Sequence, residues 1–124
     1  MDRNDLLGLH TGIGDVIENG KRLGECIFDL EIVMMPTGKI EAEGVIVEVT
    51  DGKINFEGKE TTFKISGVIS RENVAYATEF TCKISPVTYP KFVVTDVEEL
   101  FNNLKPIEEV EIEETEKPKK AKKR

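Results

Sequence analysis

The sequence predicts a mainly β domain: about six to eight antiparallel strands in meander order, forming a small barrel or a two-layer roll. Three observations favour it. Apolar and polar residues alternate along several stretches, which is the pattern of half-buried strands. Turn dipeptides separate these stretches at the spacing of short strands. A single stretch near the C-terminus has helical spacing, so one short helix should pack on the sheet.

The 124 residues are enough for one domain whose core needs neither disulfides nor metal. Trp is absent and aromatic residues make up 6%, so the core must come from Val, Ile, Leu and the six Phe. We expect a β domain over residues 1–106 and a charged, disordered tail over residues 107–124.

The first strands surround a strong turn signal. Residues 1–14 contain three glycines among their apolar residues, which predicts an irregular arm or a kinked first strand. Asn19-Gly20 then predicts a type I′ turn. The strand after it, residues 21–33, should bury one set of alternate residues, which are Cys26, Phe28, Leu30 and Ile32.

A second turn signal, Asp51-Gly52, predicts a hairpin between residues 44–50 and 54–56. Before it, Ile40 and Ala42 share one parity, whereas Val45, Val47 and Val49 share the other. A bulge at Gly44 would reconcile the two phases, and a bulge bends a strand. We therefore expect this hairpin to form the corner of a curled sheet.

The later strands follow the same alternation. Residues 61–67 and 74–84 predict two strands joined by a polar turn at 70–73, and residues 92–94 predict a short last strand. Thr95 with Glu98 reads as a capping box, followed by an apolar stripe that predicts a helix at about 96–104. This helix is too short to be stable alone and should cover an edge or an end of the sheet, stopping at Pro106.

Charge is distributed unevenly along the chain. Residues 107–116 carry six Glu, residues 117–124 carry six Lys or Arg, and residues 1–106 account for the whole net charge of −7. An acidic body disfavours a nucleic-acid-binding surface there. The basic block could still contact phosphates nonspecifically through Lys117, Lys119, Lys120, Lys122, Lys123 and Arg124. In the acidic block, Val110 and Ile112 alternate with Glu, so this fragment could pair with an open sheet edge.

No leader or membrane span is expected, because no apolar stretch follows the polar N-terminus and no run reaches the length of a span. We expect a cytoplasmic protein with both thiols reduced.

Candidate chemical groups are few. His10 is the single histidine, and Cys26 and Cys82 lie on the apolar parity of their strands. We expect these three residues to be packed side chains, since no nucleophile, base and orienting group converge. Tyr76 and Phe80 also lie on the apolar parity, which disfavours the stacking platform of an oligonucleotide-binding barrel. We expect no catalytic, cofactor-binding or metal-binding residues.

The sequence therefore favours a non-enzymatic binding or adaptor module that acts by protein–protein interaction through the β surface, an edge strand or the tail. One alternative is a nucleic-acid-associated protein that uses the basic tail. Another is a small-ligand-binding barrel or an enzyme, which would need His10, Cys26 or Cys82 to point into a cavity.

Overall fold

The computed structural model describes residues 3–54, 61–85 and 90–107. Seven strands, one 3-10 helix and one α-helix appear in this part of the chain. In order they are η1 (Arg3–Leu6), β1 (Gly8–Glu18), β2 (Lys21–Met34), β3 (Ile40–Gly52), β4 (Thr61–Arg71), β5 (Val74–Ser85), β6 (Lys91–Val94), α1 (Val97–Asn102) and β7 (Lys105–Pro106).

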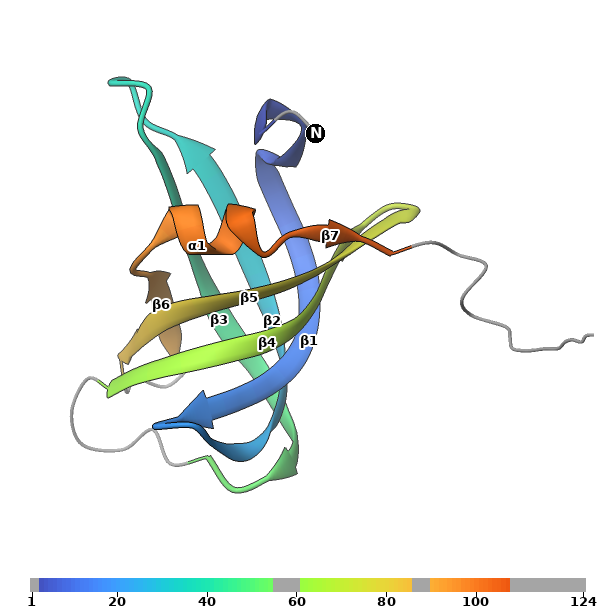
Figure 1. The fold of residues 1–124 in the computed structure, drawn as a ribbon, viewed down its shortest axis with the longest axis vertical. Coiled ribbons are helices and arrows are strands. Elements are labelled where there is room, and N and C mark those ends of the chain that lie inside the picture. Colours follow the sequence, from blue (N-terminus) through green and yellow to red (C-terminus); the bar gives the residue numbers. More distant parts are fainter. Residues whose placement is uncertain (1–2, 55–60, 86–89, 108–124) are drawn as a thin grey trace, which may run out of the picture.

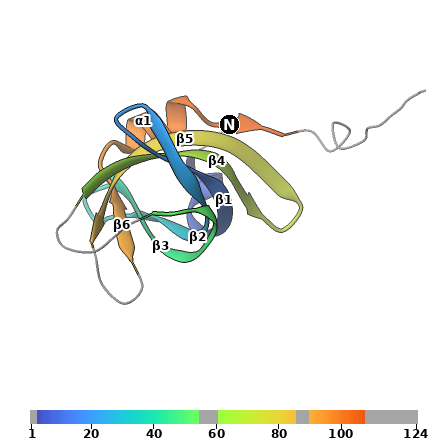
Figure 2. The same cartoon turned by 90° about the horizontal axis from the view of Figure 1, so that it is seen from below.

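All seven strands belong to one antiparallel sheet, which confirms the predicted fold class. The strands pair in the order β4-β1-β2-β3-β6-β5-β7, and β4 also pairs with β5, so the sheet closes in a ring. Figure 2, seen from below, shows β1 to β6 surrounding a common interior. Strands β1 to β3 follow meander order, whereas β4 returns to pair with β1.

The ring encloses an apolar core with three phenylalanines at its centre. The predicted inward residues of β2 are all buried, as are Phe80 and Phe92 from the opposite strands. Phe28 meets Phe80 and Phe92 edge to face, with ring centroids 6.1 and 5.9 Å apart, and the latter two rings stack on each other. Such aromatic pairs stabilise a core beyond their buried area.

The two turn dipeptides have different outcomes. Asn19 and Gly20 have positive φ angles of 54° and 80° and join β1 to β2, so the first hairpin is confirmed. The prediction of a hairpin at Asp51-Gly52 is wrong, because both residues belong to β3 and pair with Glu25 and Gly24 of β2. Residues 55–60, where the return strand was expected, partly lie outside the described residues.

Tertiary contacts explain why Asp51-Gly52 continues the strand. Arg22 bridges Asp15 and Asp51 at 3.0 and 3.1 Å, which connects β1, β2 and β3 at this end. A Cβ at Gly52 would lie 2.4 Å from the Leu23 carbonyl oxygen, so the glycine permits close approach of the two backbones.

The predicted phase change in β3 exists, but its position was wrong. The register with β2 skips Val47 and Thr50, whereas Gly44 pairs regularly with Leu30. Val47 is consequently 54% exposed and does not face the core. Gly44 serves another purpose, since a Cβ there would lie 2.4 Å from the Phe92 ring.

The helix forms where expected but begins with a different cap and ends earlier. Asp96 is the N-cap and accepts a hydrogen bond from Glu99 N–H, whereas the Thr95 hydroxyl donates to the Thr81 carbonyl. The helix ends at Asn102, and the two residues of β7, including Pro106, then pair with β5.

At its N-terminus the chain is more regular than predicted. A 3-10 turn, η1, precedes a continuous β1, and no irregular arm is present from Arg3 onward. Leu6 of η1 is buried in the core, and the Arg71 guanidinium donates hydrogen bonds to the Asp5 and Leu7 carbonyls. Residues 108–124, which contain the predicted tail, lie outside the described residues.

Candidate functional site: a groove beside an open strand edge

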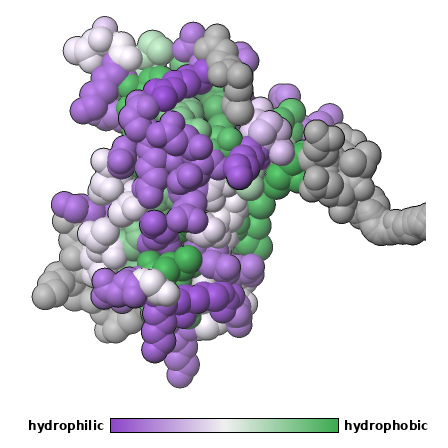
Figure 3. All heavy atoms as spheres, in the orientation of Figure 1, coloured by the Kyte–Doolittle hydropathy of each residue, from purple (hydrophilic) through white to green (hydrophobic). Residues whose placement is uncertain are grey.

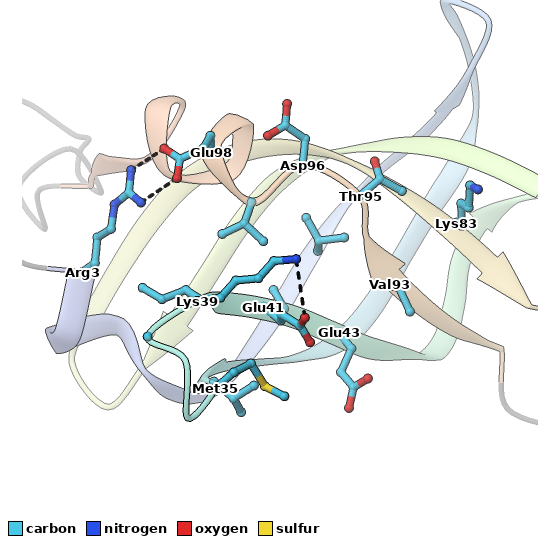
Figure 4. A pocket seen from close by; sticks show the side chains of 16 residues that line it. Arg3, Met35, Lys39, Glu41, Glu43, Lys83, Val93, Thr95, Asp96 and Glu98 are labelled. Carbon is cyan, nitrogen blue, oxygen red and sulfur yellow. Dashed lines mark hydrogen bonds and ion pairs between the residues drawn. The ribbon is translucent and has the colours of Figure 1, made fainter.

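A groove of about 1020 Å³ lies between the β2–β3 hairpin and the segment that leads from β6 into α1. One wall is the first part of β3, and the opposite wall comprises Val93 to Glu98 together with Lys83 and Arg3. In Figure 4, Glu41 and Glu43 project from β3, whereas Val93 and Thr95 project from the facing segment. Figure 3 shows hydrophobic side chains between the hairpin tip and α1, within a largely hydrophilic face.

The β3 wall is an open strand edge. The β3–β6 ladder covers only Glu43 to Val45, and in the described part of the chain no strand is in register with residues 40–42 on this side. Met35 N–H donates to the Lys39 carbonyl, and hydrogen-bonded and non-hydrogen-bonded pairs alternate from there along the β2–β3 ladder. Ile40 and Ala42 therefore direct their N–H and C=O groups away from β2, into the groove.

The edge is open because β6 is short. It has four residues, and the chain leaves the sheet at Thr95 to form the Asp96 cap of α1. The helix covers the facing strand β5 instead: Glu99 Oε1 accepts from Thr81 N–H at 2.8 Å, and Asn103 Nδ2 donates to the Glu79 carbonyl at 3.1 Å. Polar helix groups thus occupy the exposed backbone of β5 and leave that of β3 facing the groove.

Apolar residues continue from the core into the groove. Ala42 and Val94 are buried at its base, and Ile40 and Val97 are partly buried against the core. Glu41 and Glu43 alternate with them on the outer side of β3. A strand placed along this edge would therefore meet apolar side chains on its inner face and charged groups on its outer face.

Ion pairs fix one end of the groove. The Arg3 guanidinium donates to both carboxylate oxygens of Glu98, at 2.6 and 2.8 Å, and lies 4.5 Å from the centre of the Phe101 ring. These hydrogen bonds lower the pKa of Glu98 and raise that of Arg3. They hold η1 against α1, so the N-terminal turn closes that end.

The β3 wall has more anionic than cationic groups. Lys39 Nζ is 4.0 Å from Glu41 Oε2, at the limit of an ion pair. Glu43 lies directly across from Glu31 of β2, and like charges in such a pair are destabilising. Among the described residues neither Glu31 nor Glu43 forms an ion pair.

The groups considered for chemistry lie elsewhere. His10 is buried, and its Nε2–H donates to the Leu6 carbonyl at 2.8 Å, while Nδ1 has no partner among the described residues. Burial is the main reason why the pKa of His10 is lowered, and the nearby Arg71 charge adds to the effect. His10 does not line the groove.

The two cysteines are free and buried. Burial raises the pKa of both thiols to about 12, and the charge of Cys26 contributes to the shift of Cys82. Neither thiol lines the groove, and a thiol with so high a pKa is a poor nucleophile near neutral pH. The described residues contain no group of three His, Cys, Asp or Glu side chains that could hold a metal ion.

The basic residues predicted to contact nucleic acid, from Lys117 to Arg124, lie outside the described residues. The described residues include no helix long and apolar enough to cross a membrane. Comparison of the chain with protein-family models, curated proteins and solved structures finds no match.

The groove residues were not predicted as a site. The signal was nevertheless present: a three-residue last strand at 92–94 cannot cover a partner strand predicted to begin at residue 39. Recognising the mismatch required knowing that these two strands are neighbours, which separation along the chain does not reveal.

Proposed function

We propose that this protein is a non-enzymatic binding module that accepts an extended segment of another protein in the groove, as an added strand along Ile40–Ala42. The observation that carries the proposal is the open β3 edge, whose N–H and C=O groups face a groove with an apolar base. Strand addition of this kind derives affinity from main-chain hydrogen bonds and specificity from alternate side chains.

The geometry of the edge favours antiparallel addition. Every strand pair in the sheet is antiparallel, and an antiparallel segment would place two residues directly across from Ile40 and Ala42. Their side chains would face the groove base, and the residue between them would lie across from Glu41. The shortest segment that satisfies this arrangement is therefore apolar–variable–apolar.

The test uses the neutral peptide Thr-Val-Thr-Ile-Thr, with blocked termini, added to the ¹⁵N-labelled full chain. We expect amide shifts at Ile40, Glu41, Ala42 and Val94. Methylating the Val and Ile nitrogens should weaken binding by about two- to tenfold or more, because each loses a main-chain hydrogen bond. Methylating the central Thr nitrogen, which faces away from β3, should have little effect.

This comparison leaves the protein unchanged, so a folding defect cannot imitate the result. The proposal fails if neither this peptide nor a charged version of it shifts the groove amides. It also fails if the two methylation patterns weaken binding equally, since strand pairing uses only alternate N–H groups.

A nucleic-acid-associated function remains the second candidate. It is supported by the six cations of residues 117–124, whereas the acidic body opposes it. Its test is given in the Discussion.

A further inference from the structure

We infer that the segment accepted by the groove is basic: it carries Lys or Arg between two β-branched apolar residues, with the cation across from Glu41. The inference rests on the proposed function and adds the chemistry of the partner.

The first argument is the charge beside the edge. Glu41 and Glu43 project from the outer face of β3, and Glu31 lies across from Glu43 on β2. Lys39 is the nearest cation on this strand and reaches only Glu41, at 4.0 Å. A cation on the added strand would lie directly across from Glu41 and diagonal to Glu43, both within reach of a long side chain.

The whole molecule acts in the same direction. The net charge of −7 attracts a cationic segment and repels an anionic one, most strongly at low salt. The open edge is also only three residues long and is flanked by charged side chains, a combination that discourages nonspecific strand pairing. Pairing there should therefore depend on a complementary charge.

The second argument concerns the chain itself. Residues 110–112 are Val-Glu-Ile, which has the required apolar spacing with the opposite charge. Placed in the groove, Glu111 would face Glu41. The inference therefore excludes the chain's own acidic block as the preferred occupant, in the same chain or in a second copy.

The test compares Thr-Val-Lys-Ile-Thr with Thr-Val-Glu-Ile-Thr, two blocked peptides that differ in one residue, by titrating each into the full chain at two salt concentrations. Opposite and like cross-strand charges have effects of similar size and opposite sign. We therefore expect the Lys peptide to bind about two- to thirtyfold more tightly at low salt, and the ratio to shrink as salt is added.

Two variants locate the preference. Glu41→Lys reverses the charge at an outward-facing residue and should reduce the preference for the Lys peptide or invert it. The neighbouring substitution Lys39→Gln removes a cation and should tighten binding of the Lys peptide, an effect that a damaged fold would not produce.

Equal binding of the two peptides, or an unchanged ratio in Glu41→Lys, overturns the inference while strand addition stands. Absence of groove binding by both charged peptides and by the neutral peptide overturns the proposed function itself. Binding of polylysine or of single-stranded RNA to the same groove amides, as strongly as the Lys peptide, would show that cationic or anionic polymers are bound without regard to apolar spacing, and would also overturn the inference.

Discussion

Replacing Gly12 by Ala should destabilise the protein, because the centre of the core has no space for a methyl group at this position. A Cβ built on Gly12 would lie 2.3 Å from Phe28 Cζ and 2.5 Å from Phe28 Cε2. Ordinary carbon–carbon contacts are about 3.5–4.0 Å long, so the ring would have to withdraw by more than about 1 Å. Its contacts with the Phe80 and Phe92 rings oppose that movement.

The magnitude follows from two opposing effects. Inserting a methyl group into a packed core costs about 1–3 kcal/mol. Restricting the unfolded chain by Gly→Ala returns about 0.4–1 kcal/mol. We expect Gly12→Ala to lower the free energy of unfolding by about 1–2 kcal/mol, which corresponds to a Tm lower by roughly 4–16 °C for a domain of this size.

Urea denaturation and thermal melting of four proteins would test the cause: the original chain, Gly12→Ala, Phe28→Leu and the double variant. Phe28→Leu alone should be destabilising because it leaves a cavity. In the double variant the methyl group enters that space, so the two losses should sum to more than the double variant loses, by about 1 kcal/mol. Strict additivity, or a neutral Gly12→Ala, would refute the packing argument.

Three further outcomes are expected. Asp96→Ala should lower the free energy of unfolding by about 0.5–2 kcal/mol, and Thr95→Ala by less, in urea titrations; the opposite ranking would restore Thr95 as the cap. Because the pKa of His10 is lowered in the folded state, the unfolded chain binds the proton first, so stability should fall as the pH drops from about 6.5 towards the folded-state pKa. His10→Gln should flatten this slope, and an unchanged slope in denaturation curves at several pH values would contradict the assignment. Finally, filter binding of single-stranded RNA across a salt series should weaken on deletion of residues 117–124, and unchanged affinity would rule out the nucleic-acid role.

How far the sequence predicts this fold is clearest at the two turn dipeptides. Asn19-Gly20 and Asp51-Gly52 carry the same local preference for positive φ, and Gly20 and Gly52 both adopt it. Only the first forms a hairpin. The second lies in a strand held by β2 and by the Arg22–Asp51 ion pair, so the outcome is decided by contacts between residues far apart in the chain.

Parity within strands was more predictable than the position of a phase change. The alternation in β2 identified its buried side correctly, because one face of a long strand must enter the core. In β3 the slip was assigned to Gly44, yet it occurs at Val47 and Thr50. A glycine can mark a bulge or a close contact, and Gly44 marks the contact with Phe92, which is 48 residues away.

The cap illustrates a choice between neighbours that local sequence leaves balanced. Thr95 and Asp96 are both good N-cap residues, and the Thr95–Glu98 pair matched the capping-box pattern. The Thr95 hydroxyl bonds β5 and Glu98 bonds Arg3, so both are committed to tertiary contacts, and the cap moves to Asp96.

Ring closure itself explains why the open edge lies on β3. A closed sheet removes its edges only where neighbouring strands have matching lengths. Here the four residues of β6 lie between the much longer β3 and β5, which leaves backbone exposed on both. The chain covers one of the two exposures, because Glu99 and Asn103 of α1 bond the backbone of β5. The same helix start forms the far wall of the groove, so the element that completes the ring on one side also leaves the β3 edge facing a defined space. An edge so short, charged and apolar at its base is poorly suited to self-association and well suited to one complementary strand.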